Sequence, residues 1–222
     1  MSAARPLLPE EEIKLLAALN RRRDQVLFLF GRLTGFRITE LLSIRVGDVW
    51  SPAGILPEIT LSRIRLKGGQ GPQRRRVRSR TVPSNPQLRA ALQTYLGERF
   101  ERAEPAPDAF LFVSRSGENR PISRVQAYRI LKSAAISAIG EPQRIATHSL
   151  RKTFAHDVFV RSGHDLVLTQ KALGHSSVLT TARYVSPDDG KVSAAILSLG
   201  APPFPVESFA RKEVLLAPLA SA

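Results

Sequence analysis

Cysteine is absent from the sequence, and its absence excludes several kinds of chemistry. Without thiols the chain can form no disulfide framework, no thiolate nucleophile and no cysteine-ligated metal site. The acidic residues also lack the clustered spacing that a two-metal nuclease requires. The expectation is a protein without a metal or another cofactor, and a reducing compartment is compatible with this composition.

Long apolar runs are also missing. The N-terminus, MSAARPLLPEEEIKLL, has no long apolar run beside a basic one, and no window reaches the roughly 18 apolar residues of a membrane span. Internal repeats and low-complexity tracts are absent too. With 222 residues and 43% hydrophobic content, the chain can bury one core. We expect one compact domain that is soluble and cytoplasmic, and nucleoid-associated if its source is bacterial.

Negative charge is scarce relative to positive charge. The chain has 33 Lys and Arg against 19 Asp and Glu, which gives a formal net charge of +14 at pH 7. Such an excess favours a polyanion as the partner, and nucleic acid is the leading candidate. A basic surface without a function is the alternative that composition alone leaves open.

The stretch 147–184 gathers two histidines, an arginine and a tyrosine at helical spacings. His148 and Arg151 stand three residues apart, so a helix that begins at the nearby Thr and Ser capping signal presents both from one face. A glycine ends the following helical pattern directly before His175, and Tyr184 comes nine residues later. The polar residues therefore lie at helix ends, an arrangement that suits binding of a phosphate.

A further arginine, Arg37, lies in the segment TGFRITE, residues 34–40. The apolar pattern over 26–33 predicts a buried helix that stops at a glycine, and helical spacing resumes over 38–44. Arg37 is therefore expected on a rigid support. Glu40 is either a brace for its guanidinium or a simple helix-face acid. From spacing alone, a surface charge is the commoner role for a lone arginine after a helix.

Further helices are predicted by apolar spacing after Pro9, over 88–100 and over 123–139. The last of these has basic residues that are available to face DNA, namely Arg124, Arg129 and Lys132.

The segment 55–83 is typical of a β-hairpin. β-Branched residues and local alternation predict strands over 55–66 and 74–83, and the glycines between them predict a turn with Lys67 at its tip. The alternation changes parity within the first strand, which hints at a bulge.

Eight basic residues and no acid lie between positions 63 and 80. We assign DNA binding to Arg63, Arg65, Arg74, Arg75, Arg76, Arg78 and Arg80. The alternative is a solvated edge hairpin whose charges prevent edge-to-edge pairing. Lys67 is a different case, because a titratable ammonium on a flexible stem suits proton transfer better than an arginine, which stays charged.

The segments HSLRKTFA and LGHSS, followed by Tyr184, resemble the signature of the tyrosine recombinases, the phage integrase family. The segment TGFRITE resembles the earlier arginine motif of the same family, and the matched elements span roughly Leu27 to Tyr184. The resemblance implies an α+β fold, mainly helical with a small antiparallel β-sheet, like that of a tyrosine recombinase catalytic domain.

The resemblance also sets the expected domain organisation. The catalytic domain is expected over residues 1–199, and the N-terminal core-binding domain that full recombinases usually carry is expected to be absent. Residues 200–222 form a tail whose apolar end, around Phe209 and 214–216, needs a groove. The tail either passes to a neighbouring protomer or folds back on its own domain.

A catalytic set is implied by the resemblance: Arg37, Lys67, His148, Arg151, His175 and Tyr184, with Glu40 in support. In that family a tyrosine attacks the scissile phosphate, forms a 3'-phosphotyrosyl link and releases a 5'-hydroxyl, and this role falls to Tyr184. Two arginines clamp the phosphate, and His175 hydrogen-bonds it. His148 is the expected base, and Lys67 is expected to protonate the departing 5'-oxygen.

The function implied is site-specific, integrase-like recombination, in which double-stranded DNA is cleaved and rejoined without a metal. Self-association on DNA, as a dimer or tetramer, is part of the same expectation. Two alternatives stay open: DNA relaxation of the type IB topoisomerase kind, and a catalytically silent DNA-binding relative.

Overall fold

The computed structural model describes residues 4–66, 70, 72, 78–102, 106–115, 119–140, 144–175, 177–182, 193 and 197. The chain divides into two units, Met1–Val185 and Ser186–Ala222. The helices and strands named below lie in the first unit. None of the described helices is both long and apolar enough to cross a membrane.

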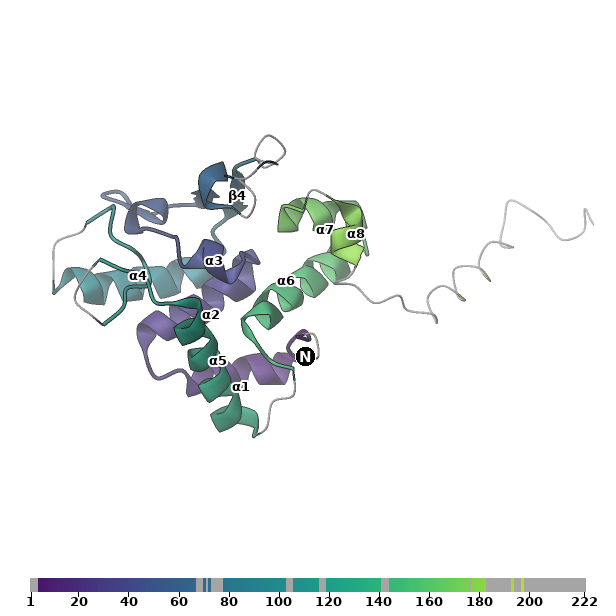
Figure 1. Cartoon of the computed structure of the whole chain (residues 1–222), viewed down its shortest axis with the longest axis horizontal. Helices are drawn as coiled ribbons and strands as arrows, with labels where there is room; N and C mark the ends of the chain where they lie inside the picture. Colours follow the sequence, from purple (N-terminus) through teal and green to yellow (C-terminus); the bar gives the residue numbers. More distant parts are fainter. Residues whose placement is uncertain are drawn as a thin grey trace, which may run out of the picture. The chain divides into compact units, whose positions relative to one another are not determined.

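Helix α2 (Arg22–Thr34) is the centre of the core, as its position in Figure 1 shows. Its run Val26–Phe30 is almost wholly buried, because this helix packs against α4 (Pro86–Phe100) and α6 (Thr147–Arg161). The Phe30 ring meets the edge of Phe112 with centroids 6.1 Å apart. Burying such side chains stabilises a fold by about 1.5 to 3 kcal/mol each.

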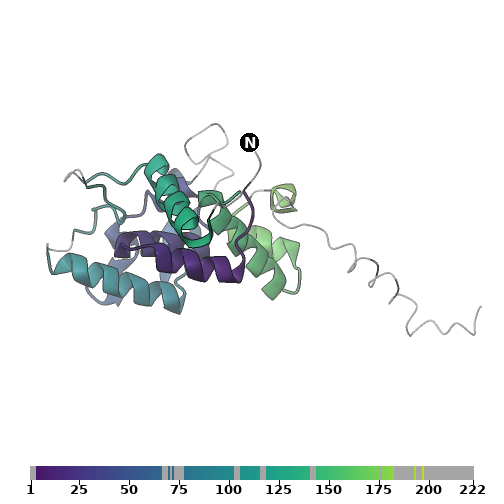
Figure 2. The ribbon, with the colours of Figure 1, turned by 90° about the horizontal axis from the view of Figure 1, so that it is seen from below.

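Helix α1 (Pro9–Ala18) lies along α5 (Arg124–Ile139), as Figure 2 shows. Pro9 occupies the first helical position, where its missing N–H costs nothing, and acidic residues fill the first turn. Glu11 accepts the Leu8 N–H at 2.9 Å. These features confirm the helix predicted after Pro9.

The β-structure is smaller than the sequence predicts. Strands β1 (Trp50–Ser51) and β2 (Gly54–Ile55) form one antiparallel pair, and β3 (Glu58–Leu61) and β4 (Arg80–Pro83) form another. The continuous strand predicted over 55–66 is wrong, because a 3₁₀ turn, η2 (Arg63–Arg65), follows β3. That turn, rather than a bulge, accounts for the change in alternation. The mainly helical fold with small antiparallel sheets is confirmed.

Three helices place the C-terminal motifs. Helix α6 runs beside α2 and leads to α7 (Leu166–Leu173), which packs against α8 (Val178–Ala182), as Figure 1 shows. Helix α3 (Ile38–Leu41) is a single turn directly after α2, shorter than the helix predicted over 38–44.

Candidate active site

Arg37 is held in place by Glu40. Arg37 precedes α3, and its backbone N–H donates to Glu40 Oε2 at 2.8 Å while its Nη1 donates to Oε1 at 2.9 Å. The Glu40 side chain is 1% exposed and that of Arg37 is 27% exposed. Of the two roles considered for Glu40, the structure shows the brace, which fixes the guanidinium with one side open to solvent.

Arg151 projects from the first turns of α6 and is 1% exposed. Its Nη1 donates to the Gly35 carbonyl oxygen, and its Nη2 donates to the Leu173 carbonyl oxygen at 2.9 Å. The same Nη2 lies 2.8 Å from Nε2 of His175. Arg151 therefore joins the end of α2, the end of α7 and the imidazole of His175.

His175 follows Gly174, which ends α7 in the left-handed conformation with φ of 63°. The imidazole is buried, and its Nδ1 lies 2.9 Å from Oγ1 of Thr181 on α8. Burial, followed by the charges of Arg151 and Arg37, lowers the pKa of His175 to about 3. The ring is therefore neutral at physiological pH.

His148 lies three residues before Arg151 on α6, and its side chain is exposed. When protonated, His148 lowers the pKa of His175, so the two imidazoles are electrostatically coupled. The helix predicted from the spacing of His148 and Arg151 is confirmed, with α6 beginning at Thr147.

Arg80 lies inside the domain and not on a solvated hairpin face. It is 8% exposed, its Nη2 donates to the carbonyl oxygens of Thr34 and Ala172, each at 2.6 Å, and its guanidinium carbon lies 4.5 Å from the centre of the Phe36 ring. Its Nε and Nη1 are buried and have no hydrogen-bond partner among the described residues. Burial, together with the charge of Arg151, lowers the pKa of Arg80 to about 9.

Arg80 and Arg151 make parallel connections between the same two helix ends. Each guanidinium binds one carbonyl at the end of α2 and one at the end of α7. The last carbonyls of a helix lack intrahelical partners and carry the negative end of its dipole. The two helix ends therefore offset part of the cost of burying two cations side by side.

The remaining predicted DNA-binding arginines fall into three groups. Arg63 and Arg78 are exposed. Arg65 instead donates to both carboxylate oxygens of Asp48, from Nη1 at 2.5 Å and from Nη2 at 2.6 Å. Its Nη1 also donates to the Ser43 carbonyl oxygen at 3.1 Å. The third group, Arg74, Arg75 and Arg76, lies outside the described residues. The predicted catalytic residues Lys67 and Tyr184 also lie outside them.

Three contacts described above were not predicted from the sequence, and only the burial of Arg80 could have been predicted from a sequence pattern. Arg80 shares the inward face of β4 with Val82, two residues on, so strand alternation predicts its burial. The pairing of Asp48 with Arg65 and the contact of Thr181 with His175 join separate elements and leave no spacing signal. Among the described residues, no group of three or more His, Cys, Asp and Glu is placed to hold a metal.

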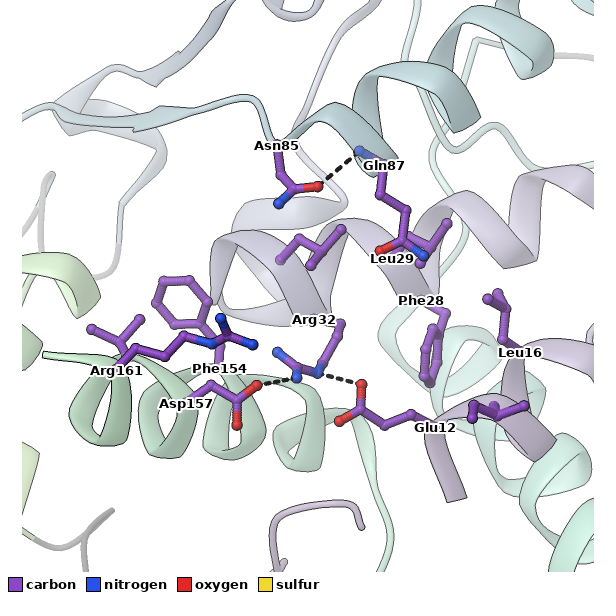
Figure 3. Close-up of a pocket in the computed structure, with 13 residues that line it drawn as sticks. Glu12, Leu16, Phe28, Leu29, Arg32, Asn85, Gln87, Phe154, Asp157 and Arg161 are labelled. Atoms are coloured by element: carbon purple, nitrogen blue, oxygen red, sulfur yellow. Dashed lines mark hydrogen bonds and ion pairs between the residues drawn. The ribbon is translucent and has the colours of Figure 1, made fainter. Parts of the chain in front are cut away.

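A cavity of 520 Å³ lies away from these residues, between α1, α2, α6 and the start of α4 (Figure 3). Its wall includes Arg32, which donates to Glu12 at 2.6 Å and to Asp157. Figure 3 shows the guanidinium between the two carboxylates. Because these pairs join side chains of α1, α2 and α6, we assign them to packing of the three helices.

Known proteins are similar in sequence to most of this chain. Residues 6–191 match the model described as "Phage integrase family". The chain is 32% identical over 190 residues to a probable integrase/recombinase, YoeC, of Bacillus subtilis, covering 86% of this chain and 92% of YoeC. It is 30% identical over 181 residues to the tyrosine recombinase XerA of Pyrococcus furiosus, covering 80% of this chain and 56% of XerA.

Solved structures show the same fold. XerH bound to its difH substrate superposes with a TM-score of 0.65 at 23% identity, over 88% of this chain and 55% of XerH. The catalytic domain of bacteriophage HP1 integrase superposes with a TM-score of 0.53 at 22% identity, over 90% of this chain and 98% of that domain. The chain thus spans about half the length of the XerA and XerH chains and nearly all of YoeC.

Proposed function

Because this chain belongs to the phage integrase family of tyrosine recombinases, we propose that it cleaves and rejoins double-stranded DNA at a specific site through a 3'-phosphotyrosyl intermediate on Tyr184. The observation that carries the proposal is the meeting of Arg37, Arg151 and His175 from three distant segments of the chain.

The charge of this site suits a phosphodiester. Arg37, Arg80 and Arg151 all act on His175 with positive charge, and Glu40 is the buried carboxylate beside them. A phosphodiester builds negative charge on its nonbridging oxygens during cleavage, and preorganised donors of this kind are typically worth about 10² to 10³ each in rate. The guanidiniums supply the positive charge, so the proposed reaction requires no metal.

Each step of the proposed reaction is assigned to a side chain. Tyr184 attacks phosphorus, and its proton passes to His148, which is exposed at the start of α6. Arg37 and Arg151 bind the nonbridging oxygens, with His175 as a third donor. Lys67 gives a proton to the departing 5'-oxygen. Rejoining reverses these transfers, because the phosphotyrosyl link keeps the energy of the broken bond.

DNA is the proposed partner. The net charge of +14 favours a polyanion, and the XerH structure is that of a complex with its difH substrate. We further propose that the chain assembles on DNA as a dimer or tetramer. The tail 200–222, which lies outside the described residues, is expected either to be exchanged between protomers or to fold back on its own domain.

Covalent capture tests the proposed reaction. A nicked duplex taken from DNA that flanks the gene is incubated with the protein, and an adduct that resists denaturation is measured. Tyr184→Phe is expected to abolish the adduct and to leave DNA binding intact. An adduct formed by Tyr184→Phe contradicts the assignment of the nucleophile.

A pair of plasmid assays separates recombination from its alternatives. Exchange between two target sites supports a recombinase, whereas relaxation of supercoiled plasmid without exchange supports a topoisomerase-like enzyme. Binding without either activity, and without an adduct, identifies a silent relative.

A further inference from the structure

The imidazole of His175 is held from both sides, and this fixes the position of its proton. Nε2 lies 2.8 Å from Nη2 of Arg151, and Nδ1 lies 2.9 Å from Oγ1 of Thr181. A guanidinium can only donate, so Nε2 is the acceptor. The ring proton therefore resides on Nδ1, which donates to the Thr181 hydroxyl. Burial and the neighbouring cations lower the pKa of His175, so the ring carries this one proton.

The proposed reaction needs the opposite polarity at Nε2. A phosphate oxygen only accepts hydrogen bonds, so a neutral imidazole that presents a lone pair from Nε2 repels it. Arg151 is proposed above to bind a nonbridging oxygen, and we take its Nη2, which now contacts Nε2, as the donor. When a phosphate takes that donor, His175 can hydrogen-bond it only with a proton on Nε2.

We propose that Thr181 is a positioning residue that lets His175 exchange tautomers when a phosphate binds. In the free protein the Thr181 oxygen accepts from Nδ1–H. With phosphate bound, the Thr181 hydroxyl donates to Nδ1, and Nε2–H donates to the phosphate oxygen. The ring stays neutral: Nδ1 loses its proton to water and Nε2 gains one from water. This inference rests on the proposed function, because it requires a phosphate beside Arg151.

The chemistry and burial of Thr181 suit this exchange. Its side chain is wholly buried, and a hydroxyl is both a donor and an acceptor, so it can serve either tautomer. A carboxylate in its place would hold the proton on Nδ1 in both states. Forming an imidazolium instead is opposed by the charges of Arg37, Arg80 and Arg151, and by His148 whenever that ring is protonated.

Thr181 also connects His175 to the element that precedes the proposed nucleophile. It lies on α8, three residues before Tyr184 in the sequence. Its neighbour Thr180 is exposed on the same helix, whereas the contact with Nδ1 of His175 is made by Thr181. The chain thus supplies a matched control, since the same substitution at position 180 leaves the buried hydroxyl in place.

The first experiment measures the tautomer of His175 directly. Long-range ¹H–¹⁵N spectra of the full chain, labelled at histidine and assigned with His175→Gln, are recorded with and without orthovanadate, an anion that imitates the reacting phosphate. We expect Nδ1–H in the free protein and Nε2–H with orthovanadate. Nε2–H in the free protein, an imidazolium with orthovanadate, or a His175 spectrum that saturating orthovanadate does not change would each overturn the proposal.

The second experiment measures the rate of covalent capture in three variants. Thr181→Val, which keeps the shape and removes the hydroxyl, is expected to slow adduct formation about tenfold without weakening DNA binding. Thr181→Ser is expected to form the adduct at a rate within about threefold of wild type. Thr180→Val is expected to form it at the wild-type rate. Thermal melting checks that the variants are folded, and a wild-type rate in folded Thr181→Val refutes the inference.

The two proposals fail in different ways. If wild-type protein forms no adduct, or Tyr184→Phe forms one, the proposed function fails. The spectra with orthovanadate still decide whether His175 exchanges tautomers, because they need no cleavage. If wild-type protein forms the adduct and Thr181→Val forms it equally fast, the function stands and the role of Thr181 is wrong.

Discussion

Replacing Glu40 by glutamine tests whether a buried carboxylate holds the cations of the site together. The Glu40→Gln side chain has nearly the same shape but no charge, so Arg37 loses its ionic partner and the neighbouring Arg80 loses a nearby negative charge. Removing one partner of a buried ion pair typically costs about 3 to 5 kcal/mol. Glutamine keeps one acceptor and Arg37 is 27% exposed, so we expect a loss of about 2 to 3 kcal/mol.

Urea unfolding of Glu40→Gln and a matched control measures this loss. The control is Glu98→Gln, because Glu98 forms an ion pair with Arg22 at 3.3 Å in which the side chains are 44% and 49% exposed. Such surface pairs contribute little, so its expected cost is at most about 0.5 kcal/mol. Capture of nicked DNA by Glu40→Gln should also fall, because Arg37 is no longer fixed. Equal stabilities for the two variants would refute the assignment of Glu40 as the brace.

The buried arginine, the neutral histidine and the hairpin can each be tested separately. Arg80→Lys should lower the free energy of unfolding by about 1 to 3 kcal/mol, measured in urea, because a lysine loses the planar guanidinium that lies over the Phe36 ring and places Nη2 between two carbonyls; an unchanged value would show that this connection is dispensable. Stability should fall as pH drops from about 6.5 towards 3, because the unfolded chain binds a proton at His175 that the native site excludes, and His175→Gln should flatten this part of the profile. Lys67→Ala should slow cleavage of ordinary DNA but be largely rescued when sulfur replaces the leaving 5'-oxygen, and a lack of rescue would remove it as the general acid. The logarithm of the DNA association constant should fall by about 0.9 per log unit of salt concentration for each phosphate neutralised. This slope should become shallower when Arg74, Arg75 and Arg76 are replaced together by uncharged residues.

Sequence patterns predicted the parts of this molecule that depend on one element at a time. The spacing of His148 and Arg151 belongs to one helix, and the relation between Arg37 and Glu40 spans a single turn, so both were visible as local periodicity. The glycine before His175 likewise marked the end of its helix.

Contacts between elements were harder to predict. A dense run of arginines indicates a DNA-facing surface, yet Arg65 is paired with Asp48 and Arg80 is inside the domain. Charge counts do not show which way a strand faces or which distant acid lies opposite. The first hairpin strand was predicted too long because its composition favours a strand, whereas the chain turns at η2. That turn places Arg65 beside the Ser43 carbonyl, a contact between separate segments that composition does not show.

The partners of Arg80 and Arg151 at the helix ends are main-chain oxygens, and this affects how the site tolerates sequence drift. Any residue supplies a carbonyl, so Ala172 can change without removing the acceptor that Arg80 uses. The strict requirement falls on backbone shape: Gly35, with φ of 61°, would bring a Cβ within 2.3 Å of Phe154. Divergent chains can therefore preserve this architecture while most of the residues that provide its acceptors differ, and alignments scored by residue identity will underestimate how much of the site they share.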